Sequence, residues 1–162
     1  SNIEVDCKLF SNVWWGKSEA IYVTAYTRKA GDHKDAGWRF PKGMADYEVG
    51  AVTDISFNNI KCESENGVFL GAEAKDKIQN IYFDQVDLMI CKRTNYEGGI
   101  YDKRPCKGDE FVKGKTYGFY LDNASNVNIR NSTVRWGDTR PSYFADTMFS
   151  QNIDGLQTVN LK

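Results

Sequence analysis

A polar turn residue followed by alternating apolar residues recurs along this chain, and this repeat constrains the fold more than any other feature. The repeat begins at Asn2, Asp54, Asn80, Asn126 and Asn152. Ile55 and Ile81, the first apolar residues of the second and third segments, lie 26 positions apart. Val127 and Ile153 are also 26 apart, and Ile3 lies two such periods before the second segment. A period in this range is typical of stacked coils, none of which can bury its apolar face alone.

Each period contains short runs with the alternation of β-strands. Further runs lie at 20–23, 67–70 and 118–121, and the residues that flank them are Gly, Asn, Asp and Ser, which favour turns. Asparagine at the start of successive coils has a physical reason, because it tolerates left-handed backbone geometry and can form a ladder when stacked. The high aromatic content, 14%, also favours strands. The sequence therefore predicts an all-β chain, a parallel β-helix of about six coils that forms one segment over residues 1–162.

Other repeat architectures and a β-sandwich fit less well. Six leucines cannot supply the pattern of leucine-rich repeats, and no run of ten or more residues has helical periodicity. A sandwich would have strands every 8–12 residues, which fits in part, but it would not explain why Asn precedes the same apolar pair at a fixed period. Long loops are expected at 28–49, 92–115 and 136–143. Such loops on a solenoid often build its binding surface.

Composition excludes several classes of function. The 162 residues include 21 Lys and Arg and 22 Asp and Glu, so the basic excess of a nucleic-acid-binding protein is absent and we expect no nucleic-acid partner. The apolar stretches are far shorter than the ~20 residues that a membrane helix needs, so we expect no membrane partner. No metal site or cofactor is expected, because there is one His and no CxxC spacing.

The four cysteines, Cys7, Cys62, Cys91 and Cys106, could form two disulfides or stay as buried thiols. A chain of this length can build a core without disulfides, which favours thiols. Cys91 and Cys106 bracket the second long loop and could also link its ends.

Two polar clusters are candidates for ligand contact. In the first, Trp14 and Trp15 could stack on sugar rings, and Lys17 and Glu19 could bind hydroxyls or pair with each other. The second surrounds Tyr101, Asp102 and Arg104 in a locally basic stretch, and arginine suits bidentate recognition of a carboxylate. The alternatives are that the tryptophans cover a coil end and that the charges pair among themselves. His33 fits a solvated loop better than a base or a metal ligand.

No catalytic residues can be assigned from motifs. Hydrolysis by paired carboxylates needs two Asp or Glu side chains about 5–9.5 Å apart, and the sequence has no Asp-Asp pair. It also lacks the GxSxG, HExxH and P-loop motifs.

Three stretches, 14–23, 62–70 and 98–105, together with the repeat, resemble the C-terminal portion of polygalacturonase-like enzymes, the pectin-degrading glycoside hydrolase family twenty-eight. The resemblance implies a right-handed parallel β-helix and inverting hydrolysis of galacturonan-type polysaccharide. The family signatures Asn-Thr-Asp, Asp-Asp, Gly-His-Gly and Arg-Ile-Lys are absent here, and in the family they lie N-terminal to the region that this chain resembles. The chain would then be a C-terminal fragment without activity of its own. Tyr26 is a counterpart, offset by about one residue, of the family's substrate-contacting tyrosine.

These observations predict part of a hydrolase acting on an acidic, pectin-like polysaccharide, in a secreted or periplasmic protein. The expected substrate-binding residues are Trp14, Trp15, Lys17, Glu19, Tyr26, Tyr101, Asp102 and Arg104. The alternative is a non-catalytic carbohydrate-binding or structural β-solenoid. In either case the exposed coil ends would allow the fragment to self-associate.

Overall fold

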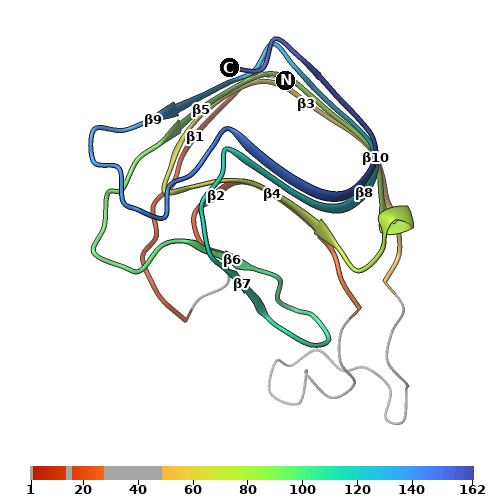
Figure 1. Ribbon diagram of the computed structural model, residues 1–162, viewed down its shortest axis with the longest axis horizontal. Coiled ribbons are helices and arrows are strands. Elements are labelled where there is room, and N and C mark those ends of the chain that lie inside the picture. The colour runs from red at the N-terminus through yellow and green to blue at the C-terminus, as the bar shows by residue number, and fades with distance from the viewer. Residues whose placement is uncertain (1, 14–15, 28–48) are drawn as a thin grey trace.

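The computed structural model describes residues 2–13, 16–27 and 49–162, which form β-strands and one short 3₁₀ helix (Figure 1). The all-β prediction is therefore confirmed. The elements are β1 (Ile3–Asp6), β2 (Glu19–Ala25), β3 (Val52–Ser64), β4 (Asn66–Ala72), η1 (Lys75–Lys77), β5 (Ile78–Ile90), β6 (Ile100–Asp102), β7 (Phe111–Lys113), β8 (Phe119–Arg130), β9 (Thr133–Trp136) and β10 (Met148–Val159).

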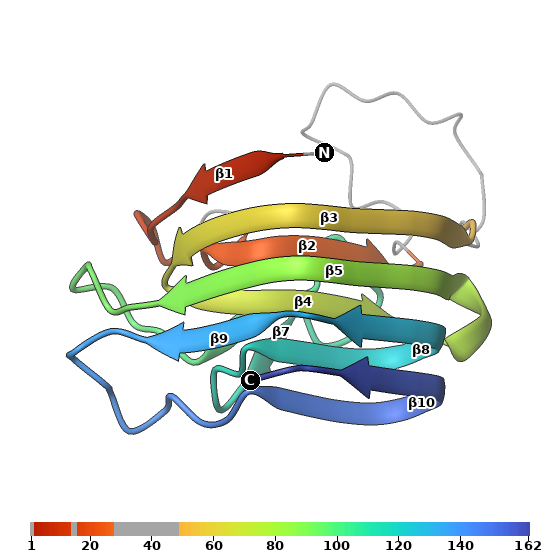
Figure 2. The same ribbon diagram turned by 90° about the horizontal axis from the view of Figure 1, so that it is seen from above.

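Eight of the strands form a single parallel sheet. Its order is β1-β3-β5-β8-β4-β2, with β9 beside β5 and β10 beside β8. Figure 1 shows this sheet curling around the interior, and Figure 2 shows β1, β3, β5, β8 and β10 following one another down the molecule. Parallel neighbours cannot be joined by a tight hairpin, so each connection must travel back to the start of the next strand.

The sheet curls because its long strands bend at residues with left-handed backbone geometry. Asp54, Asn80 and Asn126 have φ of 60°, 56° and 53°. Their side chains also form a ladder, in which Nδ2 of Asn80 donates to Oδ1 of Asp54 at 2.8 Å and Nδ2 of Asn126 donates to Oδ1 of Asn80 at 2.7 Å. Asn and Asp, with their short polar side chains, tolerate this conformation better than most residues do. The ladder predicted from the repeat is therefore present on these three strands.

The strand register confirms the middle of the repeat. Ile55 pairs with Ile81, and Ile81 pairs with Val127. The wider spacing between the last two is absorbed by the β6–β7 excursion and the loops around it. These residues point inward and form a column of the core.

The predicted position of Ile3 is wrong. It pairs with Ile60, beyond a second bend at Asn59, where φ is 53°. Nδ2 of Asn59 donates to Oδ1 of Asn2 at 2.7 Å, so the first segment aligns with this second bend. At both bends of β3 a polar residue is followed by isoleucine, as in Asp54-Ile55 and Asn59-Ile60, so the pattern around Asn2 and Ile3 fits either bend.

The predicted position of Ile153 is also wrong. It pairs with Ala124, and Leu156 takes the place opposite Val127. Gly155, with φ of 71°, lies at the bend where β3, β5 and β8 have Asp or Asn. Glycine adopts this conformation without a side chain, so the repeat leaves no asparagine at this position.

The core lies inside the curled sheet and is apolar. Phe83 is 1% exposed, stacks on Phe57 with ring centroids 5.1 Å apart, and meets Phe119 edge-on at 5.5 Å. Burying side chains of this size is worth about 1.5–3 kcal/mol each. The alternation seen in the sequence thus places one face of each strand in a continuous interior.

Of the three predicted loops, the first, 28–49, lies almost entirely outside the described residues. The second, 92–115, contains the antiparallel pair β6–β7, which the sequence did not predict because each strand has only three residues. The third, 136–143, is irregular after the last residue of β9, Trp136, as predicted. Figure 1 shows β6–β7 lying outside the curve formed by β2 and β4.

Candidate functional site

The structure gathers most of the predicted contact residues at one place. Trp14 and Trp15 lie outside the described residues. Tyr26 lies just beyond the far end of β2. The remaining five, Lys17, Glu19, Tyr101, Asp102 and Arg104, come together where the start of β2 meets β6.

Asp102 is the centre of this cluster and is fully buried, with 0% exposure. Its carboxylate accepts hydrogen bonds from the backbone N–H of Gly16 at 3.2 Å and of Arg104 at 2.9 Å. The Arg104 guanidinium adds a bond from Nη2 at 2.6 Å. Nζ of Lys17 lies 3.9 Å from the same carboxylate. Two cations and two backbone donors thus surround one buried carboxylate.

The two cations of this cluster also contact other parts of the protein. The Arg104 guanidinium lies 4.7 Å from the Phe111 ring centroid, and Nη2 donates to the carbonyl of Val13 at 3.2 Å. Lys17 lies 5.5 Å from the same ring and donates to the carbonyl of Asn12 at 3.3 Å. The cluster therefore fastens β6–β7 to the segment before β2. The charges pair among themselves, as in the alternative reading of the sequence.

Glu19 does not pair with the ammonium of Lys17. Its Oε2 instead accepts a bond from the Lys17 backbone N–H at 2.5 Å. Its Oε1 is buried without a hydrogen-bond partner in the described part of the chain. Burial, and to a smaller extent the nearby charge of Asp102, raises the pKa of the Glu19 carboxyl. Glu19 is therefore a carboxyl that binds a proton more readily than usual.

Tyr101 covers the outer face of the sheet. It is 1% exposed, and its ring lies 5.0 Å from that of Phe69 and 4.7 Å from that of Tyr120. Its hydroxyl accepts a bond from the backbone N–H of Tyr117 at 2.9 Å. Tyr101 therefore anchors the hairpin by packing, with its polar atom paired.

An aromatic column runs across the outer face of β2, β4, β8 and β10. The register places Tyr22 beside Phe69, Phe69 beside Tyr120 and Tyr120 beside Phe149. Neighbouring ring centroids lie 5.8, 5.6 and 4.9 Å apart. Tyr22, at one end, is 39% exposed. Phe69 and Tyr120, in the middle of the column, are buried beneath Tyr101 and form a second apolar cluster outside the main core.

A polar column lies beside the aromatic one, two residues further along each strand. It consists of Thr24, Gly71, Asp122 and Gln151. Tyr26 lies over the glycine, since a Cβ on Gly71 would be 2.4 Å from the Tyr26 hydroxyl. Because Gly71 has no side chain, the Tyr26 hydroxyl has room over β4, next to Asp122 on β8. Neither the Tyr26 hydroxyl nor Oδ1 of Asp122 has a hydrogen-bond partner among the described residues, although both atoms are buried.

We call Tyr26, Lys103, Asp122 and Gln151 the outer-face site. Nζ of Lys103 lies 5.7 Å from the Tyr26 ring centroid. Burial raises the pKa of the Asp122 carboxyl, against the opposing effects of a Gln151 hydrogen bond and the Lys103 charge. Burial, with a further contribution from the Asp122 charge, also raises the pKa of Tyr26. Buried polar atoms without partners are rare in proteins and call for an explanation, such as a bound molecule.

Of this site, only Tyr26 was predicted from the sequence. Lys103 lies in the locally basic stretch beside Arg104, and no sequence feature singles out Asp122 or Gln151. No local motif joins them, because they come from the turn after β6 and from β8 and β10. These residues could have been predicted as one site only from the strand register, which requires the alignment of β8 with β4 and β10.

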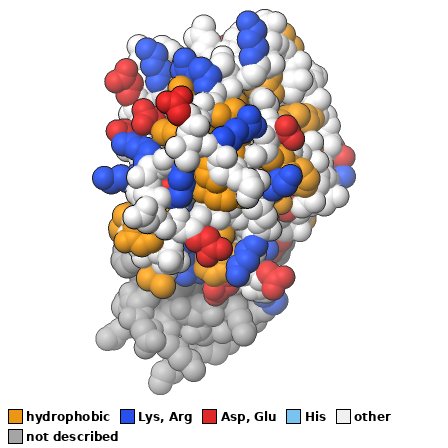
Figure 3. Space-filling view, turned by 60° about the vertical axis from the view of Figure 1, so that its left-hand side comes forward, with side chains coloured by type: hydrophobic (Ala, Val, Ile, Leu, Met, Phe, Trp, Pro, Cys, Tyr) orange, Lys and Arg blue, Asp and Glu red, His pale blue; other side chains and the backbone are white. Residues whose placement is uncertain are grey.

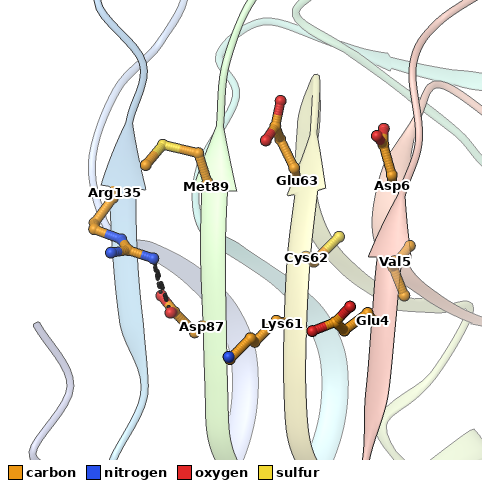
Figure 4. Close-up of a pocket in the computed structure, with 9 residues that line it drawn as sticks. All are labelled: Glu4, Val5, Asp6, Lys61, Cys62, Glu63, Asp87, Met89 and Arg135. Carbon is orange, nitrogen blue, oxygen red and sulfur yellow. Dashed lines mark hydrogen bonds and ion pairs between the residues drawn. The ribbon is translucent and has the colours of Figure 1, made fainter.

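A shallow depression of about 350 Å³ lies elsewhere, on the outer face of β1, β3, β5 and β9 (Figure 4). Side chains of both signs line it, and Asp87 pairs with Arg135 at 2.8 Å. Figure 3 likewise shows acidic and basic side chains interspersed with apolar patches on the face that it presents. This surface concentrates no single kind of ligand chemistry.

Cys7 lines a separate hollow of about 240 Å³. All four cysteines are free thiols, so the possible Cys91–Cys106 link is not formed. A hydrogen bond from the Cys62 thiol and another from Ser18 lower the pKa of Cys7, although burial opposes them. Burial and the contact with Glu63 raise the pKa of Cys91 to about 11. The thiolate is the reactive form of cysteine.

We therefore expect iodoacetamide to alkylate Cys7 at least about 10-fold faster than Cys91 at pH 7, as measured by peptide mass spectrometry over time. Ser18→Ala removes a hydroxyl that donates to the Cys7 sulfur at 3.6 Å and should slow the reaction. Equal labelling of Cys7 and Cys91 would contradict the prediction.

The described residues contain neither a metal-binding cluster nor a membrane-spanning helix. Within the ranges that the structure describes, no three His, Cys, Asp or Glu side chains cluster closely enough to hold a metal ion. No helix among these residues has the length and apolar character needed to span a bilayer.

Searches of protein-family models, of curated proteins and of solved structures found no match to this chain.

Proposed function

We propose that this chain is the C-terminal β-helix part of a polygalacturonase-like hydrolase that cleaves a pectin-type polysaccharide with inversion. Its own contribution is to bind the acidic glycan, and it lacks the catalytic carboxylates. The proposal rests on the resemblance of 14–23, 62–70 and 98–105 to that family and on the chemistry of the outer-face site. A pectin-like substrate implies a secreted or periplasmic protein, which belongs to the same proposal.

The proposed fold is a right-handed parallel β-helix. The curled parallel sheet, the columns of matching residues and the left-handed bends at Asp54, Asn80 and Asn126 support it. In such a fold the end coils bury their apolar residues incompletely. Ile153 and Leu156 on β10 are only partly buried, which supports the proposal that coil ends mediate self-association.

One observation carries the proposal of glycan binding. Two buried polar atoms, the Tyr26 hydroxyl and Oδ1 of Asp122, lack partners within the described residues, and they lie beside an aromatic column and the ammonium of Lys103. A sugar supplies what this surface lacks. Its hydroxyls can pair with both atoms, and its apolar ring face can pack on an aromatic side chain.

Binding of oligogalacturonate to the chain, measured by isothermal titration calorimetry, tests this proposal. Tyr26→Phe removes one hydroxyl and keeps the ring, so it should weaken binding by about 5–10-fold, the effect of one lost hydrogen bond. Tyr82→Phe is the matched control, because Tyr82 is a 39% exposed tyrosine on β5, outside this site. If the chain binds no glycan, or if Tyr26→Phe and Tyr82→Phe bind alike, the proposal fails.

The second candidate is a non-catalytic carbohydrate-binding or structural β-solenoid. The absence of all four family signatures from the 162 residues favours it. Both candidates predict that this chain releases no reducing ends from polygalacturonate. They differ in the coding sequence upstream, where the hydrolase requires Asn-Thr-Asp and Asp-Asp motifs within about 150 residues, roughly one domain length.

A further inference from the structure

The outer-face site contains three groups that can donate a hydrogen bond to the same ligand. Lys103 has an ammonium, Tyr26 has a hydroxyl without a partner among the described residues, and Asp122 becomes a donor when it is protonated. Gln151 on β10 pairs in register with Asp122, and Oδ1 of Asp122 has no partner among the described residues, so this oxygen is left for the ligand. A ligand that only accepts hydrogen bonds would satisfy all three.

The charges around Asp122 decide what kind of ligand this is. The groups facing it are Tyr26 after β2, Lys103 after β6 and Tyr120 on its own strand, while β4 contributes Gly71 and β10 contributes Gln151. Burial raises the pKa of Tyr120 to about 12 and that of Tyr26 also, so both stay neutral below pH 8. Lys103 is therefore the one formal charge that faces Asp122 among the residues described.

Resting on the proposed function, we propose that the outer-face site recognises the free carboxylate of a uronic acid unit, with Asp122 in its protonated form. Lys103 supplies the counter-charge, and the O–H groups of Asp122 and Tyr26 donate to the carboxylate oxygens. When Asp122 is ionised, it neutralises Lys103 and repels the incoming anion. A methyl-esterified unit has no charge to be attracted or repelled.

The sign of the pH dependence follows from this arrangement. Only the protonated site binds the anion well, so binding takes up a proton and affinity rises as pH falls through the pKa of Asp122. That pKa lies above the ordinary aspartate value because of burial. Uronic carboxylates stay mostly ionised at pH 5, since small α-substituted carboxylic acids have pKa values near about 3.5. A rise in affinity between pH 7 and pH 5 would therefore come from the protein and not from protonation of the ligand.

The test compares polygalacturonate with a fully methyl-esterified pectin at pH 5 and pH 7 by calorimetry. The full chain should bind polygalacturonate at least about 5-fold more tightly at pH 5 than at pH 7, and it should bind the ester equally at both. Asp122→Asn keeps a donor at this position, so it should bind polygalacturonate independently of pH. Lys103→Met should lose the preference for the free acid and keep its affinity for the ester.

Two controls separate this inference from other causes. The single histidine of the chain, His33, also titrates in this range, and His33→Gln should keep the pH dependence. Thermal unfolding of each variant checks that it is folded. Polygalacturonate binding that is equal to ester binding, or a pH dependence that survives in Asp122→Asn, would overturn this inference and leave the proposed function standing. If neither glycan binds at either pH, both fail.

Discussion

Replacing Asp102 by alanine should lower the free energy of unfolding by about 3–5 kcal/mol, the usual cost of removing one partner of a buried ion pair. Asp102 accepts hydrogen bonds from Arg104 and from the Gly16 N–H, and its carboxylate lies 3.9 Å from the Lys17 ammonium. Without it, Lys17, whose side chain is 4% exposed, is left as a buried cation that has lost this carboxylate. Urea unfolding followed by circular dichroism measures the loss.

A surface pair supplies the control for this substitution. Asp87 pairs with Arg135 at 2.8 Å, but their side chains are 35% and 55% exposed. Asp87→Ala should therefore cost no more than about 1 kcal/mol. Asp102→Asn should fall between the two, because the amide oxygen still accepts hydrogen bonds while the charge is lost. If Asp102→Ala costs no more than Asp87→Ala, the cluster does not fasten the hairpin as described.

The same cluster shows what local sequence could and could not reveal. Its residues were noticed because charged and aromatic side chains are dense at 14–19 and 96–105. Density alone could not tell an internal ion-pair cluster from a ligand site, since both need the same residue types. Burial distinguishes them, and burial depends on where β6 lies against β2, which no short-range pattern encodes.

The repeat was predictable wherever the residue at a bend has a side chain suited to left-handed geometry. Asn80 and Asn126 mark one bend in the sequence and form its ladder in the structure. The second bend was missed because it includes Gln85, with φ of 58°, a residue type that gives no such signal. The last bend was not predicted because Gly155 occupies it, and glycine is common in turns of many kinds.

The outer-face site depended entirely on this register. Asp122 and Gln151 are neighbours only because β10 aligns with β8, and Tyr26 reaches them only because Gly71 has no side chain. An error of one residue in the alignment would turn Asp122 from the outer face of the sheet to the core. Residues this far apart in sequence become a site only once the whole sheet is aligned.

Gly67→Ala should destabilise the fold by more than about 3 kcal/mol, because it inserts a methyl group where two backbones meet. A Cβ at Gly67 would lie 2.0 Å from the carbonyl oxygen of Tyr117 and 2.3 Å from that of Gly118. Backbone atoms cannot move aside as a flexible side chain can. The Val68 N–H donates to the Gly118 carbonyl at 2.8 Å, so relief of the clash would also break the pairing that leads into β8.

Thermal unfolding gives the measurement, since 3 kcal/mol corresponds to a fall in Tm of about 6–12 °C for a chain of this size. Gly50→Ala is the matched control. No heavy atom of the described chain lies within 4 Å of a Cβ at Gly50, so this change should alter stability by less than about 1 kcal/mol. Similar Tm values for the two variants would mean that β4 and the start of β8 are not in this close contact. The outer-face site would then lose the alignment of Gly71 with Asp122 on which it depends.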